Sequence, residues 1–294
     1  MDGLELILSS AVRLAMPLLI LAIGELVSQR SGVTNIGLEG FISIGALTAY
    51  AVALNTGDIL LAVLLACLAG ALGSMLMAIG AVWLGGNQVL VGFALFILLP
   101  NLANFVWVQS GISGGLGEQP GLAVPFLSDI PLIGPALFGP NLFLPIAVVL
   151  VISVGVFFRR TRPGLAVISA GHDPRVAASK GVNVKLVRTL SVLFAGVCAG
   201  LAGASLVVGS VGSYSADLVD GRGLIALAIV ILGRWTGGGV VVGAMAIGLL
   251  NALELAVPPS AGVPAQFLAA LPWVVVLAAL VVTAKRRSLV PRSL

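Results

Sequence analysis

Long apolar runs alternate with short polar links along the whole chain. Nine apolar segments follow one another, at roughly 5–24, 33–54, 59–83, 88–110, 141–158, 189–209, 221–233, 237–256 and 265–284. Runs of about 18 or more apolar residues are typical of membrane-spanning helices. We therefore predict an all-α polytopic membrane protein with about nine transmembrane segments, within a range of eight to ten.

Two of these segments depart from a simple membrane span. Segment 221–233 has 13 residues and would be about 20 Å long as a helix, whereas the hydrocarbon core is about 30 Å thick. The stretch 31–54 begins with three closely spaced glycines and contains an Asn and a Glu. Short or glycine-interrupted segments in both halves of a chain indicate discontinuous or re-entrant helices at a transport site. A tilted or re-entrant piece with a purely structural role is the alternative.

Composition and charge support a membrane protein and suggest its topology. The chain is 59% hydrophobic and 9% charged. Of its 15 Lys and Arg residues, seven lie between Arg159 and Arg188, and four lie near the C-terminus, at Lys285, Arg286, Arg287 and Arg292. Such clusters beside apolar spans are typical of cytoplasmic loops that meet lipid headgroups, so we do not read the net charge of +4 as a nucleic-acid-binding signal.

The charge pattern predicts one transmembrane domain over residues 1–294. If the loop 159–188 is cytoplasmic, the loop 111–140 is external, and it contains acidic residues but no Lys or Arg. Counting spans in both directions places the N-terminus outside and the C-terminus in the cytoplasm. The first segment lacks the basic start of a secretory signal, so we expect an uncleaved span.

Polar residues inside the apolar segments are the candidates for a substrate pathway. A charged side chain at the centre of a membrane helix costs about 2.5–3.5 kcal/mol and usually faces a bundle interior or a watery cavity. The candidates are Asn35, Glu39, Asn101, Asn104, Asn251 and Glu254. Each has a structural alternative, because Asn and Glu also pair the backbone groups that a broken helix leaves free.

The spacing of these residues adds detail. Asn35, Glu39 and Ser43 are spaced i, i+4 and i+8, which predicts one stripe on a helix. Glu25 lies near Arg30, and we expect the two to form an interfacial pair.

The intramembrane acids are too few for a self-powered ion symporter, and the motifs needed for an enzyme or for a metal site are missing.

The basic loop contains a short helix of its own. Asp173 and Pro174 form a helix start, with Asp as the cap and Pro at the first position, and Gly181 ends the helix. Pro163 and Gly164 predict a turn. A helix this short is unstable alone in water, so we expect it to dock on another protein.

Four stretches together resemble one family. They are AGHDPRVAASKGVNV at 170–184, SQRSGVTNIGLEGFISIGA at 28–46, GRGLIALAIVILGRWTGGG at 221–239, and the closing span with its basic tail. The chain is similar, from about residue 4 to 287, to ABC-transporter permeases of the nucleoside or simple-sugar type, in the ribose and branched-chain amino acid permease group. It departs from the family pattern at TGGG after Trp235, where members often have Asn-Pro.

The resemblance implies a permease subunit of an ABC importer in the bacterial plasma membrane. It implies a second permease, often a longer paralogue, an ABC ATPase that holds ATP-Mg, and a substrate-binding lipoprotein or periplasmic protein that delivers nucleoside. This chain would bind no cofactor. By position, the ATPase would contact Asp173, Pro174, Arg175, Ala177, Ala178 and Gly181. The alternatives are a permease for ribose or another simple sugar, an ion-coupled secondary transporter, and a membrane enzyme or scaffold.

Overall fold

The computed structural model describes residues 3–117, 143–256, 270 and 273–275, and this part of the chain is helical, without strands. Seven described segments are long and apolar enough to cross a membrane, which makes the chain a multi-pass membrane protein. They are formed by α1 (Gly3–Arg30), α2 (Leu38–Thr56), α3 (Ile59–Met77), α4 (Gln88–Ser110), α6 (Phe143–Arg160), α9 (Val184–Leu206) and α11 (Gly237–Ala256).

Shorter elements complete the described fold. The π-helical turns η1 (Ala78–Trp83) and η2 (Val207–Val211) extend α3 and α9. Helices α7 (Arg162–His172) and α8 (Pro174–Ser179) connect α6 to α9. Helix α10 (Arg222–Leu232) has 11 residues, too few to cross a hydrocarbon core at 1.5 Å per residue.

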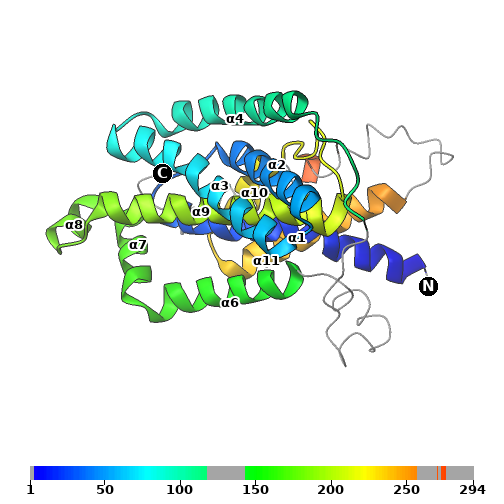
Figure 1. Ribbon diagram of the computed structural model, residues 1–294. Coiled ribbons are helices and arrows are strands. Elements are labelled where there is room, and N and C mark those ends of the chain that lie inside the picture. Colours follow the sequence, from blue (N-terminus) through cyan, green and yellow to red (C-terminus); the bar gives the residue numbers. More distant parts are fainter. Residues whose placement is uncertain (1–2, 118–142, 257–269, 271–272, 276–294) are drawn as a thin grey trace.

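Helices α1 and α9 form the centre of the bundle. Helix α9 packs against α1, α2 and α3, and α1 packs in addition against α11. Helix α4 packs against α2 along one flank, and α6 packs against α1 and α7 along the other (Figure 1). The outer faces of α3, α4 and α6 expose large apolar side chains, among them Leu68, Phe105 and Ile152, as expected of surfaces in contact with lipid.

Small residues let the central helices approach closely. The rows Ala66–Gly70–Ser74 on α3 and Gly196–Gly200–Ala204 on α9 meet face to face, because a methyl group added to Gly200 would overlap the carbonyl of Ala66. A methyl group on Gly70 would likewise overlap the carbonyl of Gly196. Small residues spaced four positions apart let helix backbones approach this closely in lipid.

Several predicted boundaries change. The segment expected at 33–54 becomes helical only at Leu38. The expected loop 159–188 consists mostly of α7, α8 and the start of α9. The ninth predicted segment, 265–284, lies outside the described residues except for 270 and 273–275, and the external loop 111–140 lies outside them beyond residue 117.

Candidate functional site

The residues that join α1 to α2 form a non-helical link, 31–37, inside the bundle. Its backbone groups are paired by side chains from other elements. Gln88, at the start of α4, accepts from the Thr34 amide at 3.0 Å and donates to the Gly32 carbonyl at 3.2 Å. Ser28 of α1 donates to the Val33 carbonyl at 2.8 Å. Backbone outside a helix is tolerated at membrane depth only when its polar groups are satisfied in this way.

This link corrects the predicted polar stripe. Asn35 lies in the link, before α2 begins, so it does not continue the helical spacing of Glu39 and Ser43. Ser43 stays on the helix and donates to the Glu39 carbonyl at 2.7 Å. The i, i+4, i+8 spacing was therefore misleading, because long-range partners stabilise a non-helical backbone where local spacing indicated a helix.

Glu39 caps the short helix α10. Its carboxylate accepts from the Gly221 amide at 2.6 Å and from the Gly223 amide at 2.8 Å. Gly221 is the N-cap of α10 and Gly223 lies in its first turn. At this end of a helix the backbone N–H groups have no partner within the helix, and the helix dipole favours a negative charge. Glu39 as a whole is 7% exposed, so the contact is largely shielded from solvent.

Glycine is required at both contact points. Gly221 has φ +75°, a left-handed conformation that side chains with a Cβ rarely adopt. A Cβ at Gly223 would lie 2.8 Å from the Glu39 carboxylate. The sequence Gly-Arg-Gly therefore lets the backbone turn and approach the acid closely.

The other end of α10 is attached to the end of α1. The Trp235 indole donates to the Gln29 side chain at 2.7 Å, and Arg30 donates to the Trp235 carbonyl at 2.9 Å through its Nε atom. Glu25 accepts from the Gln29 side-chain amide at 2.9 Å. Helix α10 thus extends from the start of α2 to the end of α1, and side-chain hydrogen bonds hold it at both ends.

The expected pair of Glu25 with Arg30 does not form. Glu25 is fully buried and also accepts from the Asn35 amide at 3.1 Å, whereas the Arg30 guanidinium lies over the Phe158 ring at 5.3 Å. Burial removes Glu25 from the interface, which is why proximity in sequence was a poor guide. Within the described part of the chain, one Glu25 oxygen and both polar atoms of the Asn35 side chain have no hydrogen-bond partner.

The remaining candidate pathway residues lie elsewhere. Asn101 is exposed on α4 and donates to the Ile97 carbonyl at 2.7 Å, a bond within its own helix. Asn104 is half-buried and accepts from the Tyr214 hydroxyl at 3.4 Å. Burial raises the pKa of Tyr214 to about 12, so this hydroxyl keeps its proton at neutral pH.

Asn251 and Glu254 are half-buried near the end of α11. Helix α11 packs against α1 and α10, whereas α4 packs mainly against α2. The structure therefore places the six candidates at three positions rather than in one cluster.

Helix α8 is exposed at one end of the bundle (Figure 1). Asp173 caps it by accepting from the amides of Arg175 and Val176 at 3.0 and 3.1 Å, and Pro174 occupies its first turn. Ala177 is 3% exposed, whereas Ala178 points outward. The chain leaves the helix through Gly181 with φ +84°. The sequence predicted this helix and its two ends correctly.

Helix α7 was not predicted. Thr161 caps it by accepting from the Gly164 amide at 3.1 Å, so Pro163 and Gly164 form a first helical turn and not the expected loop turn. Proline is favoured at that position because its missing N–H would be unpaired there anyway. The end of α7 packs where α1 meets the 31–37 link, since a methyl group on Gly171 would overlap the Arg30 carbonyl.

Sequence reasoning also missed residues of the site itself. Gln29, Gln88 and Trp235 pair with groups more than fifty positions away, and nothing local marks those pairings. The described residues contain no group of three or more His, Cys, Asp or Glu side chains placed to hold a metal ion.

Comparisons with known proteins agree over almost the whole chain. A family model described as branched-chain amino acid transport system / permease component matches residues 7–285. The nucleoside ABC transporter permease protein NupC of Lactococcus lactis subsp. cremoris is 33% identical, over 93% of this chain and 90% of that protein. No solved structure matches the chain.

Two further relatives are similar. The guanosine ABC transporter permease protein NupQ of Bacillus subtilis is 29% identical, over 94% of this chain and 91% of that protein. The putative glucose ABC transporter permease protein TsgC13 of Haloferax volcanii is 34% identical, over 85% of this chain and 77% of that protein.

Proposed function

The chain belongs to the family of branched-chain amino acid transport system permease components, and from this membership we propose that it is the permease subunit of an ATP-driven ABC importer for nucleosides. The likeness to a nucleoside permease over nine-tenths of both chains is the observation that carries the proposal. Such a subunit moves substrate without hydrolysing ATP, which a partner ATPase with its bound ATP-Mg would do.

The complex we propose has three further components. They are an ABC ATPase at the cytoplasmic face, a second permease that is a longer paralogue, and a substrate-binding lipoprotein or periplasmic protein outside. The permease would have about nine transmembrane segments, some of them discontinuous or re-entrant, with its N-terminus outside and its C-terminus in the cytoplasm. The seven Lys and Arg residues between Arg159 and Arg188, at one end of the bundle, favour that orientation.

Helix α8 is the proposed contact with the ATPase. Its exposed face includes Arg175 and Ala178, and the helix leads directly into α9 at the centre of the bundle. Arg188 of α9 donates to the Ser31 carbonyl at 3.1 Å and to the Ala170 carbonyl at 3.4 Å. A displacement of α8 would therefore reach both α9 and the 31–37 link, which adjoins α10.

The 31–37 link and the short helix α10 form the proposed pathway wall. Asn35 would contribute from the link. Glu39, at the start of α2, would contribute beside α10, where it acts as the hydrogen-bond anchor of that short helix. Four further residues would contribute at other depths. They are Asn101 and Asn104 of α4, and Asn251 and Glu254 of α11. The uptake of a neutral polar solute needs such hydrogen-bonding groups but no dense set of ionised ones.

Sugar transport is the second candidate, because the putative glucose permease of Haloferax volcanii is 34% identical to this chain. The two candidates separate in proteoliposomes that contain the purified complex. We expect ATP-dependent uptake of labelled guanosine or uridine that excess ribose or glucose does not inhibit, and an ATPase with an inactivated Walker lysine as control should abolish it. Uptake driven by an ion gradient without ATPase would refute the importer.

A further inference from the structure

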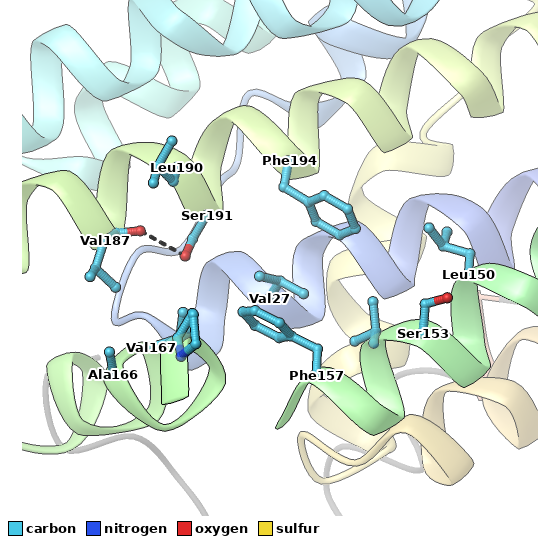
Figure 2. Close-up of a pocket in the computed structure, with 12 residues that line it drawn as sticks. Val27, Leu150, Ser153, Phe157, Ala166, Val167, Val187, Leu190, Ser191 and Phe194 are labelled. Atoms are coloured by element: carbon cyan, nitrogen blue, oxygen red, sulfur yellow. Dashed lines mark hydrogen bonds between the residues drawn. The ribbon is translucent and has the colours of Figure 1, made fainter. Parts of the chain in front are cut away.

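An apolar groove separates α6 from the centre of the bundle. Its volume is about 530 Å³. Helices α6 and α9 form its two walls, Val27 of α1 forms its floor, and α7 closes one end. Figure 2 shows the rings of Phe157 and Phe194 projecting into the groove from opposite walls, with Val27 between them.

Each wall is one continuous helical face. The lining residues of α6 are Leu150, Ser153, Val154 and Phe157, and those of α9 are Val187, Leu190, Ser191 and Phe194. Both sets follow the spacing i, i+3, i+4 and i+7, which places side chains on one side of a helix. The groove is therefore elongated and runs along the helix axes for about 10 Å.

The groove contains very few hydrogen-bonding groups that could bind a polar solute. No charged residue lines it, and its polar side chains are two serines. The Ser191 hydroxyl donates to the Val187 carbonyl of its own helix at 2.9 Å. A nucleoside would lose its hydrogen bonds with water here without replacement, so the groove lies outside the proposed transport pathway and suits a hydrocarbon chain.

Cations gather where the groove ends. Arg159, Arg160 and Arg162 flank the corner between α6 and α7, directly after Phe157. All three residues are exposed, and none of their side chains has a hydrogen bond or ion pair with another described residue. By contrast, Arg30 and Arg188 near the same end are bound to backbone carbonyls. Phe157 and Arg160 are separated by about 5 Å along the axis, the distance between a lipid's upper chain and its headgroup region.

We propose that this groove binds an anionic phospholipid, with one acyl chain between α6 and α9 and the headgroup phosphate on the arginines at the α6–α7 corner. Apolar area and basic side chains contribute together to such binding. A second permease covering the same face would remove three cations from water without pairing them, which is costly. A phosphate instead offsets part of their charge and accepts their hydrogen bonds.

Native mass spectrometry of the full-length protein in detergent tests this site, with phosphatidylglycerol and phosphatidylcholine as probes. We expect phosphatidylglycerol to bind more tightly. Ser153→Phe fills the groove and should weaken binding of both lipids on the order of tenfold, because about two methylene groups lose their burial. Ile152→Phe is the matched control, since Ile152 is 59% exposed on α6 and does not line the groove, and it should leave binding unchanged.

The charge contribution is measured separately. Replacing Arg159, Arg160 and Arg162 together by Gln should lower phosphatidylglycerol affinity on the order of tenfold or more. Phosphatidylcholine affinity should fall less, because the choline cation of that lipid offsets the charge of its phosphate. A photo-reactive amino acid at position 153 should label a lipid. Equal binding of the two lipids, no effect of Ser153→Phe, or labelling of a protein subunit or of another segment of this chain would each overturn the proposal.

Discussion

The contact between Glu39 and α10 allows a quantitative prediction for Glu39→Gln. Each of the two amide hydrogen bonds, at 2.6 and 2.8 Å, goes to an ionised acceptor, and such bonds contribute about 1.5–3 kcal/mol each. The glutamine would keep one acceptor oxygen but would present its NH₂ group to the second amide. A neutral side chain is also easier to bury, which offsets part of the loss. We expect a destabilisation of about 2 kcal/mol.

The matched variants give an ordered series. Glu39→Ala removes both acceptors and leaves two shielded N–H groups unpaired, so we expect a larger loss of about 3–5 kcal/mol. Asp217→Asn changes an exposed acid in the neighbouring loop, and we expect less than about 0.5 kcal/mol.

Two measurements check the series. Chemical unfolding in detergent compares the stabilities of the variants with that of the unmodified protein. Hydrogen–deuterium exchange of residues 218–226 reports the cap directly, and exchange there should be faster in Glu39→Gln. Unchanged stability and protection in that variant would refute the cap, and normal protection with lost uptake would mean that the carboxylate serves the pathway instead.

Three other substitutions test the packing, the coupling contact and the attachment of α10. Gly200→Leu would overlap α3 and should destabilise the bundle by about 3 kcal/mol or abolish folding, whereas Gly155→Leu, with open space around it, should give normal yield by size-exclusion chromatography. Val176→Asp changes an α8 side chain that is 55% exposed, so it should reduce ATP-dependent uptake about tenfold or more without altering thermal stability; normal uptake would refute the contact. Trp235→Phe leaves a buried amide oxygen unpaired and should cost about 1–3 kcal/mol in unfolding measurements, more than Trp83→Phe, whose indole bond to a threonine is exposed.

The membrane itself made much of the fold predictable. Each long apolar segment within the described residues is a helix because lipid offers no partner for an open backbone. The close contact at Gly70 and Gly200 has its own physical cause, because only small residues let helix backbones approach this far. Asp173 and Pro174 marked the start of α8 because capping depends on adjacent residues alone.

The 31–37 link and helix α10 were less predictable, because their hydrogen-bond partners are distant in sequence. The spacing of Asn35 and Glu39 indicated one helix, yet Gln88 and Glu25 stabilise a non-helical link around Asn35. The sequence left two roles open for Glu39, pathway wall and helix anchor, and the amides of Gly221 and Gly223 support the second. Local patterns contain no information on pairs about 180 positions apart.

The attachment of α10 at both ends has a consequence for biogenesis. Helix α10 is too short to span the bilayer alone. The side chains that form hydrogen bonds at its two ends come from α2 and α1. The ribosome makes α1 and α2 before α10. Helix α10 therefore enters a bundle in which its hydrogen-bond partners are already in place. Circular permutants that translate α10 before α1 and α2 should therefore leave it without partners during insertion and expose it to membrane quality-control proteolysis.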